Sequence, residues 1–544
     1  MPETAETDLV ADHSLGAGAK LDKIVIIVLV VFFAIGLYFR VSDLDAIGFA
    51  EDEVNKVDAI RRYSQGDITA NGEHPMLMKA LMFVSVKLGR SVAAGKALPD
   101  EVLFRLPNAL FGALTLLPLF LLTAAFFDRW TGLLAAAFWS VGINAITFNR
   151  VGKEDTLLVF FMLFAFYFYL RAKQTDSRSV KVRSRHYLMS GISFGLMIAS
   201  KYFPHYLGLN SLYHHYVRVR QRAPGEPAGK TSLIFYIALV AAFLVANPAV
   251  LMPSVWEYLN SYMGEKLLTH SGYLFADHLY KNTVSSTPFW GTPIYFYLLF
   301  LAIKLPLMLL VAFVIGLVAA VRNWRHPGHA FVLFMFLFWI VPYSLMGAKW
   351  LRYTLSLMPF IYMFAAIGVV ALLRFVINRF KIPARAAAIL AGASVVVFIG
   401  FPTWSTYSAA PHYALYTNAL GAGHVGYFFP HDEFYDDGLR DAIKFVSNTA
   451  PPGAILAHET PATTRYYLER FARQDLRPKP MSASDFDPAT IDGPAYIIVQ
   501  RGRTYFENRD KLAFVRTKFQ RVHEVTVRGI PAAEVFVNQP PPIK

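Results

Sequence analysis

Long apolar runs alternate with short polar turns along the first three quarters of the chain. A helix that crosses a bilayer needs roughly 20 mostly apolar residues. By this criterion the sequence predicts eleven spanning helices, over residues 24–41, 103–126, 131–148, 155–171, 187–200, 202–217, 232–252, 294–321, 330–347, 354–373 and 384–402. The fifth and sixth are short, and the proline of the intervening SKYFP favours a break over one continuous helix.

The pattern changes after residue 402, where polar and turn-forming residues become frequent. DDGLRDAIKFVSNT and TTRYYLERFAR have helical spacing, GAILAHE and AYIIVQ are typical of strands, and VHEVTVRGIPAAEVFV predicts a hairpin across GIP. We therefore expect a small α/β domain at 403–544. It follows a transmembrane domain at 23–402, which contains a long first loop (42–102), and residues 1–22 are expected to form a disordered tail.

Composition agrees with a membrane protein, because 55% of the 544 residues are hydrophobic and only 17% are charged. Soluble domains contain about 25% charged residues. The chain has no cysteine, which excludes disulfides, thiolate metal sites and cysteine nucleophiles. The N-terminal segment is acidic and lacks a basic stretch before the first apolar run, so we expect an uncleaved helix and not a signal peptide.

Basic residues gather in four short loops, at 171–185, 218–230, 321–329 and 374–385. With eleven spans these loops lie on one side together with the N-terminus, and the positive-inside rule makes that side the cytoplasm. The net charge of +14 is thus a topology signal, and no nucleic-acid partner is expected. The pattern predicts an integral protein of the inner (plasma) membrane, with the C-terminal domain on the extracytoplasmic face.

Acidic residues stand at the start of the first outer loop, in GFAEDEVNK. The loop mixes apolar and polar positions at helical spacing, which favours helices lying along the membrane interface. Asp52 and Glu53 would begin the first of these helices. Acids in a first turn also complement the helix dipole, which is the purely structural alternative.

A second cluster lies in the turn NRVGKED, where Arg150, Lys153, Glu154 and Asp155 separate two apolar spans. Ionisable groups at membrane depth are costly and often mark substrate paths. The structural alternative is a snorkelling arginine and an N-cap aspartate. Further cations occupy the outer ends of other spans: Lys79, Lys201, Lys349 and Arg352.

Carboxylates and cations on one face suit the transfer of a sugar from a lipid phosphate to a hydroxyl. A carboxylate takes the proton of the incoming hydroxyl, a step worth about 10²–10⁴-fold in rate. Arginine and lysine hold the departing phosphate. A groove between apolar spans holds the lipid tail.

The order of these motifs resembles the protein O-mannosyltransferases. DEVNKVDAIRRYSQGD followed by GEHPMLMK is similar to the family's first loop, with Asp52 and Glu53 as its acidic pair. His74, Pro75 and Lys79 match the later signature, although Met76 replaces its second proline.

Further motifs continue the resemblance to about residue 360. FRLPNALFGALT matches the arginine-led second span at Arg105, and Arg150 with Asp155 fits the family's Arg-x4-Asp motif. SKYFPHYLGL resembles a Ser-Lys-aromatic stretch. LRYTLSLMPF resembles an element of the wider glycosyltransferase C superfamily, which includes the aminoarabinose transferases of lipid A.

The resemblance implies an α-helical polytopic membrane protein with a glycosyltransferase C-type fold and a polyprenyl-phosphate-linked sugar donor. It implies inversion at the anomeric carbon, with Asp52 as base, Glu53 in support and Asp155 as a further acidic site residue. The implied residues for the donor phosphate or sugar are Lys79, His74, Arg105, Arg150, Lys201 and Arg352. The loop 253–293 is too short for the β-trefoil of the eukaryotic enzymes, so a protein hydroxyl and a lipid or glycan both remain as acceptors.

Other features leave alternatives open. His270, Asp277 and His278 could bind a divalent metal, although their spacing matches no compact motif and no cofactor is firmly expected. We expect Lys304 near the outer interface. The segment 412–437 is either a connector or part of an acceptor cleft. A lipid flippase or transporter is the rival function, but repeated halves, which are frequent in transporters, are not evident.

Overall fold

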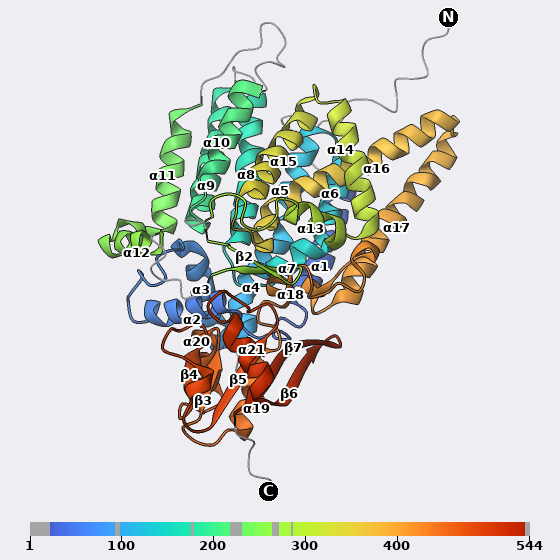
Figure 1. Ribbon diagram of the computed structural model, residues 1–544. Helices are drawn as coiled ribbons and strands as arrows, with labels where there is room; N and C mark the ends of the chain where they lie inside the picture. The colour runs from blue at the N-terminus through green and yellow to red at the C-terminus, as the bar shows by residue number, and fades with distance from the viewer. Residues whose placement is uncertain are drawn as a thin grey trace, which may run out of the picture.

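The computed structural model describes residues 22–92, 98–175, 179–217, 231–263, 271–283 and 287–538. A bundle of helices occupies most of the molecule, and a smaller mixed domain is attached at one end (Figure 1). The helices of the bundle and its connections are α1 (Lys23–Val41), α2 (Glu51–Tyr63), α3 (Met76–Val92), α4 (Asp100–Leu114), α5 (Leu116–Phe126), α6 (Arg129–Val141), α7 (Ile143–Asn149), α8 (Asp155–Gln174), α9 (Val180–Ser200), α10 (His205–Leu212), α11 (Leu233–Ala246), α12 (Pro253–Met263), α13 (Phe296–Lys304), α14 (Leu307–Arg322), α15 (Pro327–Leu345), α16 (Met358–Phe380), α17 (Ala384–Ala409) and α18 (Pro430–Phe434).

Several predicted spans are interrupted. The run 131–148 bends by 56° between α6 and α7 at Gly142, where an added Cβ would lie 2.1 Å from the hydroxyl oxygen of Tyr362. The run 294–321 breaks at Leu305, which is extended because it precedes Pro306. Within the described residues, six helices are long and apolar enough to cross a bilayer, or seven if the bent pair is one span. The number eleven therefore stays a prediction.

Glycines allow a close helix contact between α14 and α16. A Cβ added to Gly316 would lie 1.7 Å from the carbonyl oxygen of Phe364, and one added to Gly368 would lie 2.0 Å from that of Ala312. The two backbones therefore touch, as small residues commonly permit in membrane helix pairs.

The first loop and the C-terminal domain share one end of the bundle. Figure 1 shows α2 and α3 lying across the lower end, directly above the red C-terminal elements. Glu101 of α4 is buried there and accepts hydrogen bonds from the Tyr467 hydroxyl at 3.1 Å and from Arg470 at 2.7 Å. The polar clusters of the first loop thus lie between the bundle and this domain.

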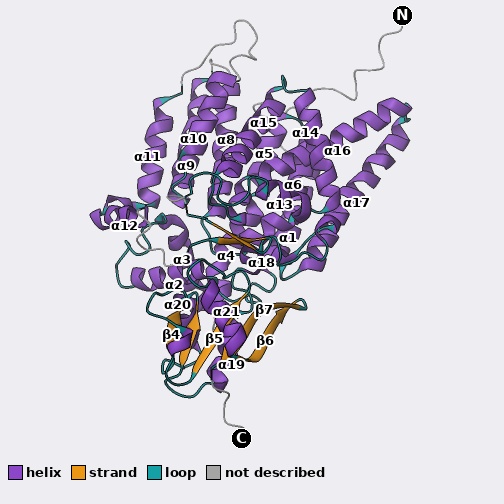
Figure 2. Ribbon diagram, in the orientation of Figure 1, coloured by secondary structure: helices purple, strands orange, loops and turns teal. Residues whose placement is uncertain are grey.

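The C-terminal domain contains one five-stranded sheet with the order β4-β3-β5-β7-β6 (Figure 2). Strands β3 (Ile455–His458), β4 (Arg477–Pro480) and β5 (Ala495–Gln500) are parallel, and β5, β7 (Ile530–Val537) and β6 (Gln520–Val527) are antiparallel. The C-terminal domain also contains helices α19 (Leu439–Thr449), α20 (Pro461–Arg470) and α21 (Arg509–Lys518). The remaining strands, β1 (Tyr273–Phe275) and β2 (His278–Tyr280), form a small antiparallel hairpin outside this domain. The predicted α/β character is confirmed, although β4 and α21 were not predicted.

Candidate active site

Asp52 lies in the first turn of α2 and is the focus of three contacts. Its Oδ2 accepts from Arg352 at 2.6 Å and from the hydroxyl of Tyr435 at 2.7 Å, and it forms an ion pair with Lys153. All three contacts go to Oδ2, and no hydrogen bond joins Oδ1 to another residue that the structure describes. The side chain is 31% exposed, so one carboxylate oxygen remains accessible.

Burial raises the pKa of Asp52, but the positive charges of Lys153 and Arg352 outweigh this effect and hold it well below its usual range. Conversely, burial and the neighbouring Arg352 lower the pKa of Lys153 to about 8. Asp52 is therefore an ionised carboxylate whose charge is neutralised by cations from two other segments.

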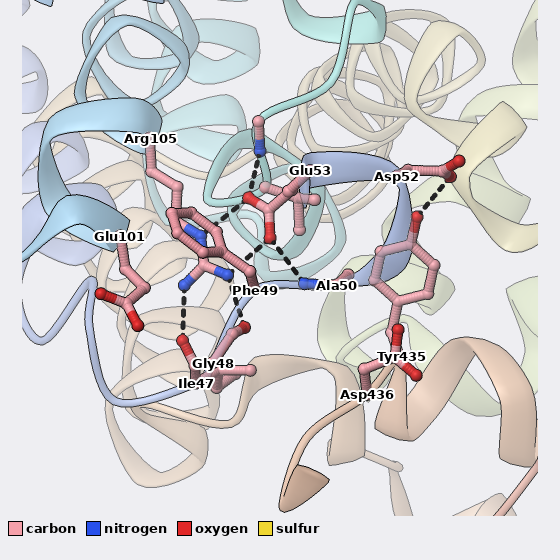
Figure 3. Close-up of polar contacts among 12 residues, drawn as sticks. Ile47, Gly48, Phe49, Ala50, Asp52, Glu53, Glu101, Arg105, Tyr435 and Asp436 are labelled. Atoms are coloured by element: carbon pink, nitrogen blue, oxygen red, sulfur yellow. Dashed lines mark hydrogen bonds and ion pairs between the residues drawn. The ribbon is translucent and has the colours of Figure 1, made fainter. Parts of the chain in front are cut away.

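Glu53 has a different environment (Figure 3). Its carboxylate is buried and accepts from Arg105 at 2.8 and 2.6 Å, from the Gly152 amide at 2.7 Å and from the Ala50 amide at 3.0 Å. These bonds join the start of α2 to α4 and to the turn between α7 and α8. Glu53 is thus fully engaged in holding the site together.

A second buried ion pair lies behind Asp52. Lys56 and Glu154 are 3.0 Å apart, with both side chains 1% exposed, and Nδ1 of His74 is 3.8 Å from Glu154. Burial lowers the pKa of His74 well below its usual value, so the ring is neutral at pH 7. His74 therefore offers a hydrogen-bonding group and no positive charge.

Asp155 begins α8 and pairs with Lys201, whose Nζ is 2.7 Å from Oδ1. The ammonium also lies over the rings of Phe203 at 4.5 Å and Tyr353 at 5.1 Å. Tyr353 is the neighbour of Arg352 in the short 3-10 helix Leu351–Ser356. The two predicted motifs at Asp155 and Lys201 are thus brought to the same region as Arg352.

Three of the predicted donor-binding cations donate hydrogen bonds to backbone carbonyls of the surrounding segments. Arg105 donates to the carbonyls of Leu44, Ile47 and Gly48 as well as to Glu53. Arg150 donates to the carbonyls of Phe39, Arg40, Ser42 and Asp43 at the end of α1. Lys79 donates to the carbonyls of Ala70, Asn71 and His74. Their contacts support the loops around Asp52, and a role in donor binding stays a prediction.

A pocket opens beside these groups. Its lining combines charged side chains with the apolar surface of the loop after α1 and the segment after α17. The polar and charged residues of the lining include Lys153, Asp155, Arg352, Asp432 and Tyr435. Burial raises the pKa of Asp432 to about 6, against the hydrogen bond that it accepts from Tyr273. A cavity with cations on one wall and apolar surface on another fits an amphiphile with a charged head group.

Comparisons with known proteins agree with this geometry. Residues 77–252 match a family model described as dolichyl-phosphate-mannose-protein mannosyltransferase. ArnT from Cupriavidus metallidurans in the apo state is similar with a TM-score of 0.51 and 17% identity, over 95% of this chain and 97% of that chain. ArnT bound to undecaprenyl phosphate gives a TM-score of 0.50 and 16% identity, over 94% and 98%.

A third similar structure is the archaeal oligosaccharyltransferase AglB from Archaeoglobus fulgidus, in complex with an inhibitory peptide and a dolichol-phosphate. It has a TM-score of 0.51 and 12% identity, over 88% of this chain and 69% of that chain. A search of curated proteins finds no match to the sequence.

The chain has the glycosyltransferase C fold. The resemblance predicted from the sequence is thereby confirmed, including its similarity to the protein mannosyltransferases and to ArnT. The matches to solved structures, at 12–17% identity, show the fold, and the family model covers residues 77–252.

Within this glycosyltransferase C fold, the segment 412–437 lies at the site. Tyr435 contacts Asp52, and Glu433 of the same segment forms a 2.5 Å ion pair with Lys304. Lys304 is buried and its ammonium also donates to the Ala414 carbonyl. Its expected place near the outer membrane interface stays a prediction. Tyr435 could hardly be singled out from the sequence, because an aromatic- and glycine-rich connector looks the same whether or not it reaches an active site.

The metal alternative has little support in the described part of the chain. No three His, Asp or Glu side chains come together there in a way that could hold an ion. His270 lies outside the described residues. The metal prediction therefore stays open at that position.

Proposed function

We propose that the protein is an inverting glycosyltransferase that moves a sugar, mannose or a similar one, from a polyprenyl-phosphate donor to an acceptor hydroxyl. The observation that carries the proposal is the partly exposed Asp52 carboxylate, held between two cations beside the cavity. The acceptor is a protein serine or threonine or a hydroxyl of a lipid or glycan. The reaction takes place on the extracytoplasmic face of the inner membrane.

In this mechanism Lys153 and Arg352 bind the donor phosphate. Arginine can contact two phosphate oxygens, whereas lysine acts as a point charge. Lys201 is the third cation of this region, but its ion pair with Asp155 makes it a weaker candidate for the phosphate. The polyprenyl chain lies against the apolar walls and the bilayer.

Asp52 is the base. It accepts the proton of the acceptor hydroxyl while the acceptor oxygen attacks the anomeric carbon from the face opposite the phosphate. The bond between that carbon and the phosphate oxygen breaks, and its electron pair leaves with the polyprenyl phosphate. The transferred sugar therefore has inverted configuration.

Because Asp52 is paired with Lys153 and Arg352, donor binding changes the basicity of its carboxylate. A carboxylate that is paired with two cations is a weak base, because its anionic form is stabilised. When the phosphate takes over Lys153 and Arg352, Asp52 loses part of this stabilisation and its basicity rises. The base is thus activated only when a donor is present.

The test is a donor screen with purified protein in vesicles. Polyprenyl-phosphate mannose and polyprenyl-phosphate pentoses are supplied with serine- or threonine-containing peptides or with lipid acceptors, and release of polyprenyl phosphate and the anomeric configuration of the product are measured. Release coupled to an inverted product supports the proposal and identifies the sugar. Movement of donor across the bilayer without release would contradict it and favour a flippase.

A further inference from the structure

Arg503 connects the C-terminal domain to the helix that carries Asp52. It lies in the loop after β5, and its side chain is 5% exposed. Its Nε and Nη2 donate to the two oxygens of Asp436 at 2.8 and 2.5 Å, and its Nη1 donates to Glu51 at 2.9 Å. One guanidinium therefore joins the loop after α18 to the first residue of α2.

Both partners of Arg503 are adjacent in sequence to groups that determine the position of the Asp52 carboxylate. Glu51 directly precedes Asp52, and Asp436 directly follows Tyr435, whose hydroxyl donates to Asp52. The amide of Glu51 also donates to Asp436 at 2.9 Å. The contacts Arg503–Glu51, Glu51–Asp436 and Asp436–Arg503 form a closed ring around the start of α2.

The backbone at this position needs such support. Tyr435 and Asp436 have φ angles of +39° and +69°, a left-handed conformation that is unfavourable for residues other than glycine. Two successive residues persist in it only when surrounding contacts hold them. The bidentate ion pair of Asp436 with Arg503 is such a contact.

Arg503 is itself held in place. Its Nη1 donates to the hydroxyl of Tyr505 at 3.1 Å, and its carbonyl accepts from Asn508 at 3.0 Å. The preceding Gly502 has a φ of +84°, and a Cβ added there would lie 2.4 Å from the backbone nitrogen of His431. The loop after β5 is thus closely fitted against α18.

The place of this loop in the sheet is informative. Strands β3 and β5 are parallel, and the carboxyl ends of parallel strands are where α/β domains commonly bind ligands. Here the buried Arg503 follows the carboxyl end of β5 and contacts polypeptide from the membrane part of the chain. In this protein, the end of the sheet where other α/β domains commonly bind a ligand contacts α2, the helix that carries Asp52.

We propose that Arg503 is a positioning residue for Asp52, acting through Asp436, Tyr435 and Glu51, so that the C-terminal domain completes the active site. The proposal rests on the proposed role of Asp52 as base. A planar, bidentate group is needed because Arg503 must bind both oxygens of Asp436 and still reach Glu51. Lysine has the same charge, but its ammonium cannot donate to both oxygens of Asp436 and to Glu51 with the planar geometry of a guanidinium.

The test uses the full-length protein with Arg503→Lys and the matched control Arg521→Lys. Arg521 lies in the same domain and pairs with Glu524 and Glu534, but its side chain is 52% exposed. Two properties are measured: hydrogen exchange of the amides in 48–56 and 430–440, and the kcat and KM for the donor. For Arg503→Lys we expect faster exchange confined to these segments, kcat lower by about 10²-fold and KM changed by no more than about threefold. The control should match the wild type in both properties.

Wild-type exchange and kcat in Arg503→Lys would overturn the proposal, as would faster exchange throughout the chain, which indicates general destabilisation. A lower kcat with unchanged exchange would also overturn it, because Arg503 would then act in another way. A second variant, Asp436→Asn, should give the same loss of kcat, and the double variant should lose little more. If the fold-losses of kcat in the two single variants multiply in the double variant, Arg503 and Asp436 do not act through one contact.

Failure of the proposed function gives a different result. Exchange needs no turnover, so it reports the positioning even if no donor is accepted. Faster local exchange in Arg503→Lys together with an unchanged kcat would show that Arg503 positions the start of α2 but that Asp52 is not the base.

Discussion

Asp52 and Glu53 are neighbours in the chain but lie on different sides of the first turn of α2 (Figure 3). The carboxylate of Glu53 has all its bonds within the protein, whereas that of Asp52 is bonded through one oxygen only. One acid of the pair is therefore structural and the other is available for chemistry. The family resemblance assigns Asp52 as base and Glu53 in support, whereas the residue types alone do not separate two neighbouring acids.

Replacement of Glu53 should affect folding more than chemistry. Glu53→Gln leaves the buried guanidinium of Arg105 without a charged partner, and breaking such a pair costs about 3–5 kcal/mol. We expect a marked fall in the Tm measured by a thermal-shift assay in detergent. Glu524→Gln is the control, since its pair with Arg521 is exposed and contributes little. Equal Tm values for the two variants would contradict the structural role of Glu53.

Lys153 should make donor capture depend on pH. Its pKa is lowered to about 8 by burial and by Arg352, so the ammonium loses its charge as pH rises through 8. The value of kcat/KM, which reports the free enzyme, should fall above pH 8. In Lys153→Arg this fall should move to much higher pH, because arginine stays charged.

Lys349 provides the control for the pH profile. Burial lowers its pKa to about 8 as well, but its ammonium donates to the carbonyls of Thr292 and Met346 and not to Asp52. Lys349→Arg should leave the fall of kcat/KM above pH 8 in place. A profile that shifts in Lys349→Arg and not in Lys153→Arg would contradict the assignment.

At the scale of the elements, the interruptions of the helices position the site. The bend at Gly142 and the end of α7 bring the turn 150–155 against α2, and the break at Leu305 places Lys304 beside Glu433. Straight helices through the same apolar runs would not place these charges in the interior. The site therefore depends on a few breaks in otherwise continuous apolar segments.

The contact between α14 and α16 should be sensitive to side-chain size. Gly316→Val places carbon atoms where the backbone of α16 lies, since even a Cβ would be 1.7 Å from the Phe364 carbonyl oxygen. Overpacking of this kind costs about 1–3 kcal/mol or more. We expect a lower Tm and a lower yield of folded protein.

Gly392→Val in α17 is the matched control, because a Cβ there meets no atom within 4 Å. It should behave like the wild type in the same assay. A Gly316→Val protein as stable as Gly392→Val would show that the two helices are not in backbone contact.

At the scale of the whole molecule, the C-terminal domain and the helical bundle share a buried polar interface. Glu101 of α4 accepts from Tyr467 and Arg470, and the Phe49 amide donates to the Tyr467 hydroxyl at 2.6 Å. The same interface contains Arg503 and Asp436. The domain is thus joined to the bundle at the site itself.

Loss of the charge at Glu101 should loosen this interface. In Glu101→Gln the hydrogen bonds from Arg470 and Tyr467 lose their charged acceptor, at a cost of about 1–2 kcal/mol because Arg470 is partly exposed. We expect faster limited proteolysis between the bundle and the domain. Asp485→Asn, at a pair whose acid is 71% exposed, should be cleaved at the wild-type rate. Equal cleavage rates for the two variants would contradict the role of Glu101 in joining the C-terminal domain to the bundle.

Much of this architecture could be predicted from the sequence. The apolar runs predicted the bundle, the strand-like run AYIIVQ predicted β5, and VHEVTVRGIPAAEVFV predicted the β6–β7 hairpin. The motif resemblance predicted Asp52, Asp155, Lys201 and Arg352, which the structure brings together. The pairing itself could not be predicted, because Arg352 lies 300 and Tyr435 lies 383 residues from Asp52. Contacts at that separation depend on the helix breaks and on the docking of the C-terminal domain, which have no local signature.

In the proposed mechanism the exposed oxygen of Asp52 accepts the proton of the acceptor hydroxyl. The most direct measurement is release of polyprenyl phosphate under single-turnover conditions by the wild type and by Asp52→Asn, with donor binding measured in parallel. Asp52→Asn should bind the donor, and its rate of release should be lower by about 10²–10⁴-fold. If Asp52→Asn binds the donor and releases polyprenyl phosphate at the wild-type rate, Asp52 is not the base.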